Sequence, residues 1–320
     1  MKSSTAMAQP YKQLTPQQRS SKRANYFKRT WMLYLMLVLP MLFFLIFRYI
    51  PMGNIIIAFE DYSMFKGIFA SPFAGFKWFA QAFSSNDFYN ALRNTFVLNI
   101  LDLIIGFPAP IILAILLNEL AFKRYKKVSQ TIAYMPHFLS WIIVSALATQ
   151  LLGPSTGVIN MLLMSLGLQP IDFLMDKTLW VGTYLFLGVW KEIGWNTIIY
   201  LAAITGINAE LYEAAEVDGA KRLRKIWHVT LPGLRPTIVV LLIMAIGRIL
   251  GSEFDRPYAL MNPMVLPVAD LISTLVYRVG IKSFQFSYTA AIGLFQSVVS
   301  VVFLVGSNSI AKRVGDRGIW

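Results

Sequence analysis

The sequence predicts an all-α, polytopic membrane protein with six transmembrane helices. Of its 320 residues, 56% are hydrophobic and only 14% are charged, whereas an average soluble domain carries roughly a quarter charged residues. The mean hydropathy is +0.57. Six apolar runs come near the ~20 residues that a helix needs to cross a bilayer. The expected spans are residues 31–50, 95–118, 129–152, 179–206, 237–254 and 284–310.

The segments before, between and after the spans can be assigned in the same way. Residues 1–30 are polar and basic and predict a mobile cytoplasmic tail, and residues 311–320 predict a second one. The first apolar run is too long for a signal-peptide core and lacks a cleavage pattern, so it is interpreted as a retained span. Residues 157–168 carry apolar residues at helical spacing and are expected to lie along the membrane surface. Prolines inside the runs are expected to kink their helices, namely Pro40, Pro108, Pro110 and Pro136.

The distribution of basic residues predicts the orientation. If both termini are cytoplasmic, the inner segments hold 19 Lys and Arg, the outer segments hold 7, and 3 lie within spans. An excess of basic residues on the cytoplasmic side is the rule for membrane proteins. The net charge of +13 therefore sets orientation, and no nucleic-acid partner is expected.

Several kinds of chemistry are absent from the sequence. It has no cysteine, which excludes disulfides, zinc–thiolate sites and cysteine nucleophiles. No G-x-x-x-x-G-K-[ST] motif occurs, so the chain lacks this device for holding ATP phosphates. No group of histidines and carboxylates has metal-ligand spacing, and His137 and His228 are interpreted as packing residues. We expect no cofactor, metal or catalytic residue in this chain.

A charged segment at residues 207–236 separates the fourth and fifth spans. Asn208 is a candidate N-cap for a short helix over Ala209–Val217. Asp218-Gly219 should end that helix, because glycine adopts the left-handed conformation of a helix terminus. A second amphipathic helix should follow and stop at Leu231-Pro232. Two short helices at a bend could dock into a groove of a cytoplasmic partner, or the segment could be an ordinary basic loop that only sets orientation.

A motif within this segment resembles a known family. Glu213-Ala214-Ala215 is followed by Gly219, then by Val229 and Leu231-Pro232. This spacing is similar to the EAA loop of binding-protein-dependent ABC importer permeases and departs from it only at Val229. The segments R-Y-I-P-M-G, A-L-R-N-T-F, Y-M-P-H-F-L-S-W, W-K-E-I-G-W-N-T and F-S-Y-T-A-A-I-G resemble the LplB-type branch of maltose-importer-like carbohydrate permeases.

The resemblance implies the type I importer permease fold and a role in taking up an oligosaccharide or polysaccharide fragment across a bacterial cytoplasmic membrane. It implies that partner ATPase subunits bind ATP and Mg, that a second permease subunit completes a heterodimer, and that an extracytoplasmic solute-binding protein delivers the sugar. By the same resemblance, the residues that couple the chain to the ATPase are Glu213, Ala214, Ala215, Asp218, Gly219, Leu231 and Pro232.

Polar residues in the middle of the fourth span are candidates for the substrate pathway. Charges at this depth are costly and usually face a cavity or a partner. Tyr184, Lys191 and Trp195 fall on one helical stripe, with Glu192 and Asn196 beside it. Aromatic faces next to hydrogen-bonding groups suit a sugar, and Lys191 and Arg248 could favour an acidic one. The alternative is an internal Lys–Glu pairing, with or without Arg248, that fastens helices together. The full candidate set is Tyr184, Trp190, Lys191, Glu192, Trp195, Asn196 and Arg248.

Two other function classes compete with the importer. A self-sufficient secondary transporter would relay an ion or proton through Lys191, Glu192 and Arg248, and would be driven by a gradient rather than by ATP. A membrane enzyme acting on a lipid-linked sugar would have Glu253 and Asp255 as its best catalytic pair. Neither class accounts for the charged segment at residues 207–236.

Overall fold

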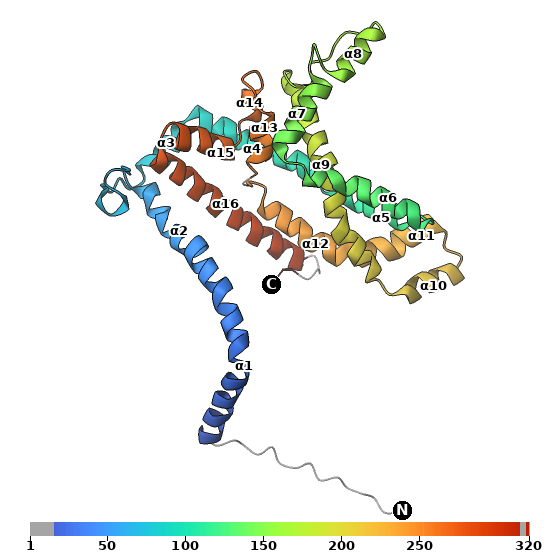
Figure 1. Cartoon of the computed structure of the whole chain (residues 1–320), viewed down its shortest axis with the longest axis horizontal. Coiled ribbons are helices and arrows are strands. Elements are labelled where there is room, and N and C mark those ends of the chain that lie inside the picture. Colours follow the sequence, from blue (N-terminus) through green and yellow to red (C-terminus); the bar gives the residue numbers. More distant parts are fainter. Residues whose placement is uncertain (1–15, 252, 314–317, 320) are drawn as a thin grey trace, which may run out of the picture. The chain divides into compact units, whose positions relative to one another are not determined.

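A computed structural model describes residues 16–251, 253–313 and 318–319 (Figure 1). Throughout this part of the chain the regular structure is helical, as predicted, and the extended pairing is a single antiparallel bridge between Glu60 and Phe73. The chain forms two compact units, residues 1–56 and residues 57–320. Residues 1–15, 314–317 and 320, which belong to the predicted tails, lie outside the described residues.

The first unit is one long helical segment. It consists of α1 (Pro16–Phe44), a π-helical turn (Leu45–Tyr49), α2 (Ile50–Met52) and the start of a 3-10 helix (Gly53–Phe59). The most apolar window of Lys28–Phe59 has no buried residue. Because α1 begins at Pro16, the second half of the predicted tail 1–30 is helical, and the mobility expected of the tail stays a prediction. A proline is suited to this first position, since its fixed φ angle matches a helix and a first-turn N–H has no intrahelical partner.

The second unit is built on its four longest helices, α4 (Asn86–Ile105), α9 (Lys177–Thr205), α12 (Leu231–Gly247) and α16 (Phe286–Arg313), together with α5 (Pro108–Asn118). These five helices pack through apolar faces. Helix α9 contacts α4, α5 and α12, and α16 contacts α12 and the short helix α3 (Lys77–Ser84). One apolar cluster surrounds Trp180 and Tyr184 of α9, a second joins Phe88 of α4 to Tyr288 of α16, and a third joins α5, α9 and α12.

Shorter helices connect the longer ones. Between α5 and α9 lie α6 (Lys123–Tyr134), a 3-10 turn (Met135–Phe138), α7 (Trp141–Leu152) and α8 (Val158–Ser165). Between α9 and α12 lie α10 (Ala209–Val217), α11 (Arg222–Lys225) and a π-helical turn (Ile226–Thr230). The segment between α12 and α16 contains α13 (Asp255–Leu260), α14 (Leu266–Ala269), α15 (Ile272–Val276) and a π-helical turn (Tyr277–Lys282). The predicted surface segment 157–168 thus contains a helix, α8.

Four helical segments of the described chain are long and apolar enough to cross a membrane. They are Lys28–Phe59, Asn86–Asn118, Arg222–Gly247 and Phe286–Arg313. A bent pair, Lys123–Phe138 with Trp141–Leu152, would be a fifth if it forms one span. Helix α9 has 29 residues, which is enough length, but it carries Lys191 and Glu192 near its middle. Six spans therefore stay a prediction.

The third expected span is not one straight helix. The axis of the chain turns by 103° between Lys123–Phe138 and Trp141–Leu152. Pro136 lies in the 3-10 turn at the bend, and Ser140 caps α7 by accepting a hydrogen bond from the backbone N–H of Ile143 at 3.3 Å. Pro136 was expected to kink this span, and the bend lies where the proline interrupts the helical hydrogen bonds.

The predicted stop at Leu231-Pro232 is wrong. The helix continues through both residues, and Arg222–Gly247 forms one helical segment of 26 residues. A π-helical turn at Ile226–Thr230 directly precedes Pro232. The wider π turn shifts the hydrogen-bond pattern, and Pro232 sits in the first turn of α12, where an N–H group is not needed. The predicted fifth span, residues 237–254, accordingly begins and ends too late, because α12 is Leu231–Gly247.

Candidate functional site

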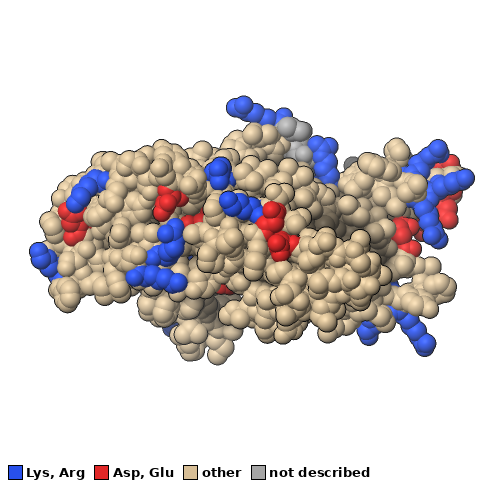
Figure 2. All heavy atoms as spheres, turned by 90° about the horizontal axis from the view of Figure 1, so that it is seen from above, with Lys and Arg blue, Asp and Glu red and all other residues tan. Residues whose placement is uncertain are grey.

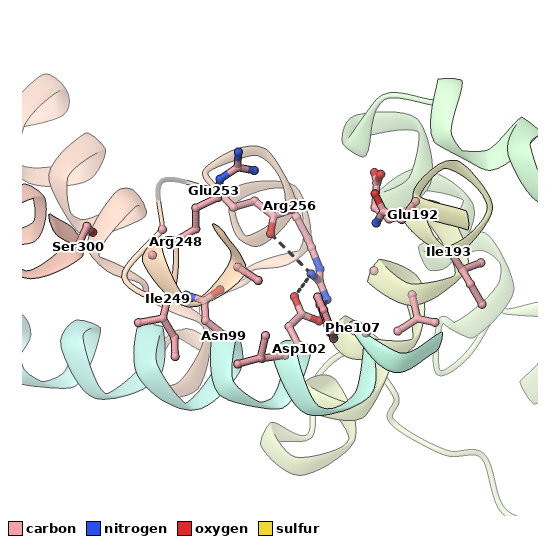
Figure 3. A pocket seen from close by; sticks show the side chains of 18 of the residues that line it. Asn99, Asp102, Phe107, Glu192, Ile193, Arg248, Ile249, Glu253, Arg256 and Ser300 are labelled. Carbon is pink, nitrogen blue, oxygen red and sulfur yellow. Dashed lines mark hydrogen bonds and ion pairs between the residues drawn. The ribbon is translucent and has the colours of Figure 1, made fainter. Parts of the chain in front are cut away.

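A cavity of about 940 Å³ opens among the longer helices of the second unit (Figure 3). Its walls come from α4 and the turn before α5, the middle of α9, the end of α12 with the turn after it, and α16. The volume lies at the upper end of the ~300–1,000 Å³ that is usual for small-molecule sites. Polar and charged residues line much of it, namely Asn99, Asp102, Glu192, Asn196, Arg248, Glu253, Arg256, Gln296, Ser297 and Ser300.

Arg256 is the most heavily bonded of these residues. It lies in the first turn of α13 and is only 3% exposed. Its Nη1 is 2.5 Å from Oδ2 of Asp102 and 3.6 Å from Oε2 of Glu253. Its Nη2 lies 3.2 Å from Oδ1 of Asp102 and donates to the carbonyl oxygen of Tyr184 at 2.7 Å. A two-pronged arrangement of this kind is the strongest geometry for an arginine and a carboxylate.

Two aromatic rings and a glycine complete the surroundings of Arg256. Its guanidinium carbon is 3.7 Å from the ring centre of Tyr184 and 5.6 Å from that of Trp141, so cation–π attraction adds to the ion pair. A Cβ atom added at Gly188 would overlap the guanidinium. The absence of a side chain at Gly188 is therefore what lets the arginine lie against α9.

Lys191 and Glu192 form a second polar cluster with His137. The Lys191 Nζ lies 2.9 Å from Oε1 of Glu192 and donates to the carbonyl oxygen of His137 at 3.0 Å. Oε2 of Glu192 is 2.8 Å from Nδ1 of His137. The rings of His137 and Trp195 are stacked, with centroids 4.4 Å apart and planes at 2°. This cluster ties the bend between α6 and α7 to the middle of α9.

The residues expected on the substrate pathway are divided by the structure. Glu192, Asn196 and Arg248 line the cavity, whereas Tyr184, Trp190, Lys191 and Trp195 do not. Tyr184 is 1% exposed and lies between Trp180 and Arg256. Lys191 is buried and pairs with Glu192, as the alternative interpretation of an internal Lys–Glu pair predicted. Arg248 takes no part in this pair. Trp195 is 44% exposed and lies outside the cavity wall.

Sequence reasoning did not single out Asp102, Arg256 or Gln296. Asp102 and Gln296 are polar residues inside predicted spans, and their position within a span is the signal that could have marked them as candidates. Gln296 donates from its Nε2 to the carbonyl oxygens of Leu250 and Gly251, which holds the turn after α12 against α16. Arg256 gave no such signal, because it lies in a predicted outer loop.

The charged segment at residues 207–236 has the predicted bend. Helix α10 covers Ala209–Val217, and Oδ1 of Asn208 accepts a hydrogen bond from the backbone N–H of Glu210 at 3.1 Å. Gly219 has a φ of +74°, a conformation that strongly favours glycine. The hydroxyls of Tyr212 and Thr230 are 3.0 Å apart and connect α10 to the π-helical turn.

The outer surface of this segment is open. Glu213, Ala214, Asp218, Gly219 and Pro232 are exposed, while Ala215 and Leu231 are half-buried. Figure 2 shows Lys, Arg, Asp and Glu side chains gathered at the end of the molecule that carries α6, α10 and α11. Four large apolar side chains are exposed on the segment as well, namely Leu211, Val217, Leu223 and Trp227.

Comparison with known proteins identifies the family. The model of the binding-protein-dependent transport system inner membrane component matches residues 82–316. Protein LplB of Bacillus subtilis is 45% identical over 293 residues, which cover 92% of each chain. The chain belongs to this family. The polygalacturonan/rhamnogalacturonan transport system permease protein YteP of the same bacterium is also 45% identical, over 288 residues and 90% of each chain.

Solved structures support the same assignment. The fold matches a chain of a bacterial ABC transporter that imports the acidic polysaccharide alginate, with a TM-score of 0.85 and 40% identity over 92% of this chain and 100% of the other. A structure of bacterial alginate ABC transporter in complex with an alginate pentasaccharide-bound periplasmic protein matches with a TM-score of 0.84 and the same identity. The type I permease fold that the motif implied is thus confirmed. The chain is a transport component, as its family describes, and not an enzyme. The described residues contain no group of three or more His, Asp or Glu placed to hold a metal ion.

Proposed function

We propose that the chain is the transmembrane permease subunit of an ATP-driven importer for an oligosaccharide or polysaccharide fragment. Its partners are ABC ATPase subunits, a second permease subunit and an extracytoplasmic solute-binding protein. The observation that carries the proposal is the cavity between α4, α9, α12 and α16, whose volume and polar lining suit a sugar better than an ion. The substrates named for YteP, polygalacturonan and rhamnogalacturonan, and for the solved transporter, alginate, are polysaccharides as well.

The segment at residues 207–236 is proposed to couple the permease to its ATPase. Its apolar side chains Val217, Leu223 and Trp227 are exposed, which is expected of a surface that docks into a partner. The π-helical turn makes α11 and α12 one continuous helical segment. A displacement of the coupling segment would therefore be carried directly into a helix that lines the cavity. With this segment facing the ATPase, both termini are cytoplasmic.

The charges around the cavity favour a sugar that bears carboxylates. Asp102 and Glu253 face Arg256, and Glu192 faces Lys191 and His137. Arg248 lines the cavity and is exposed, and its guanidinium makes no hydrogen bond or ion pair with another described residue. Figure 3 shows its guanidinium directed away from the Asp102–Arg256 pair. A carboxylate on the sugar would pair with Arg248 in the two-pronged geometry that guanidinium groups favour.

The experiment measures sugar uptake by the complete transporter in vesicles that are supplied with its solute-binding protein. Vesicles that contain ATP are compared with vesicles that do not. Oligogalacturonate and its carboxyl-reduced, neutral form are compared for the parent chain and for Arg248→Gln. We expect ATP-dependent uptake and a loss of tenfold or more in the preference for the acidic sugar in the variant, since a charge-assisted hydrogen bond is worth about 1.5–3 kcal/mol.

Lys282→Gln is the matched control, because it removes a positive charge outside the cavity. If Arg248→Gln leaves the preference unchanged, the assignment of Arg248 is wrong while the importer stands. Uptake that follows an ion gradient and ignores ATP would instead favour a secondary transporter.

A further inference from the structure

An aromatic loop at residues 60–76 protrudes from the second unit on a well-defined stem. The stem is closed by hydrogen bonds from the backbone N–H of Asp61 to the carbonyl oxygen of Pro72 at 2.8 Å, and from that of Ala74 to the carbonyl oxygen of Phe59 at 2.7 Å. The Ser71 hydroxyl fixes the tip, because it accepts from the backbone N–H of Ser63 at 3.1 Å and donates to the carbonyl oxygen of Gly67 at 2.7 Å.

Three contacts fasten this stem to the helices behind it. Lys77 of α3 pairs with Asp61 at 2.8 Å, and the indole N–H of Trp78 donates to the carbonyl oxygen of Glu60 at 2.9 Å. The backbone N–H of Tyr62 donates to the hydroxyl of Ser287 at 3.0 Å. Ser287 is the second residue of α16, so the stem lies at the first turn of a candidate membrane span.

The tip of this fastened loop is apolar and bare. Phe65 and Phe69 are fully exposed and Met64 is largely so, even though the backbone around them is held by hydrogen bonds. The tip carries one charge, Lys66, and residues 62–76 contain no acidic residue. Apolar side chains gathered on a fixed scaffold beside a lysine are typical of a surface that inserts into the boundary between headgroups and acyl chains.

The position of the loop limits how far its tip can lie from α16. Phe65 is three residues from Tyr62, and a chain extends by at most ~3.3–3.6 Å per residue, which limits the reach to about 11 Å. The headgroup layer on each side of a bilayer is roughly 5–8 Å thick. If α16 crosses the membrane from its first turn, Phe65 is therefore within reach of the boundary between headgroups and acyl chains.

We propose that Met64, Phe65 and Phe69 form a lipid anchor that inserts into the membrane leaflet at this end of α16. Lys66 lies at the level of anionic headgroups and pairs with their phosphates. A lipid surface fits better than the solute-binding protein, because a partner that binds and leaves would return two complete phenyl rings to water in every cycle. Lipid surrounds the neighbouring spans at all times, so the rings stay covered.

The absence of cysteine in the chain allows a direct measurement. A nitroxide is attached to Phe65→Cys in the complete transporter, reconstituted into vesicles of equimolar phosphatidylcholine and phosphatidylglycerol. Its collision rates with oxygen, which partitions into lipid, and with a water-soluble nickel complex report its depth. We expect the label to collide more often with oxygen than with the nickel complex, whether or not the solute-binding protein is present.

Two further sites calibrate this measurement. Val302→Cys, on the exposed surface of the middle of α16, is the reference for a label in lipid. Gln81→Cys, on the exposed side of α3, is the reference for a label that is close to the loop but is not part of its aromatic tip. A label at residue 65 that the nickel complex reaches freely overturns the proposal. A label that becomes protected only when the solute-binding protein is added also overturns it, and assigns the loop to protein docking.

Discussion

At the scale of single residues, the fit between Arg256 and α9 is the most constrained feature of the cavity wall. A buried guanidinium is tolerated only when its charge and its N–H groups are matched, since removing one partner of a buried pair costs about 3–5 kcal/mol. Asp102, Glu253 and the Tyr184 carbonyl match the charge and the two terminal nitrogens of Arg256, whereas its Nε–H is buried without a hydrogen-bond partner among the described residues. Gly188 supplies the space. The ion pair thereby joins α4, α9 and the turn after α12 at one point.

We expect Gly188→Ala to destabilise the chain by about 1–3 kcal/mol, the usual cost of overfilling a packed site. The added methyl group would push Arg256 away from Asp102, so sugar uptake should fall with it. The measurement is the thermal unfolding midpoint of the purified transporter, together with its uptake rate.

Gly182→Ala is the matched control, because it lies on the same helix and a Cβ there meets nothing within 4 Å. It should leave stability unchanged or raise it by up to about 1 kcal/mol, the gain in helix propensity. If the two variants unfold at the same temperature, the close approach of Arg256 to Gly188 does not contribute to stability.

At the scale of elements, the bend after α10 depends on one backbone conformation. Gly219 at a φ of +74° lets α10 end and α11 begin within a few residues. A β-branched residue strongly disfavours this conformation, and residues held in rare backbone regions cost of order 1–3 kcal/mol. A Cβ atom added at Gly219 would meet nothing within 4 Å, so the cost would be confined to the backbone.

Gly219→Val should therefore uncouple transport without preventing insertion. We expect uptake to fall at least tenfold and the ATPase rate to lose its response to the loaded solute-binding protein, while the amount of chain in the membrane is unchanged. Gly306→Val is the control, because that glycine lies within α16 and an added Cβ has open space. Normal uptake by Gly219→Val would rule out a coupling role for the bend.

Two elements also show the limits of local sequence rules. Pro136 and Pro232 both interrupt an apolar or amphipathic run, and the same rule predicts a kink or a stop at each. The chain turns by 103° next to Pro136 but continues as a helix through Pro232. The difference is the π-helical turn before Pro232, which places the proline in the first turn of a new α-helical stretch. Nothing in the residues 226–230 taken alone distinguishes such a turn from an α-helix.

At the scale of the whole molecule, the course of α9 decides the topology. Helix α8 precedes it and α10 follows it. If α9 crosses the membrane, Ser165 and Glu216 lie on opposite sides, the coupling segment is cytoplasmic, and six spans result. The excess of basic residues on the predicted inner segments supports this arrangement.

Cysteine substitution tests this directly, because the parent chain offers no competing thiol. A membrane-impermeant maleimide added to intact cells from which any outer wall has been removed should label Ser165→Cys. It should label Glu216→Cys only after the membrane is made permeable. Labelling of both sites in intact cells, or of neither, would contradict six spans.

Composition, periodicity and one motif were enough to predict the membrane class, the family, the helical content and the bend at Gly219. Each of these depends on residues that lie close together in the chain, such as Glu213 to Pro232. Which charged residues meet became known only from the packing of the helices. Arg256 and Asp102 are 154 residues apart in the chain, and Lys191 turned inward to Glu192 and His137 while Arg248 stayed in the cavity. The packing of helices that are far apart in the chain decides which charged residues pair, and no local sequence pattern encodes that packing.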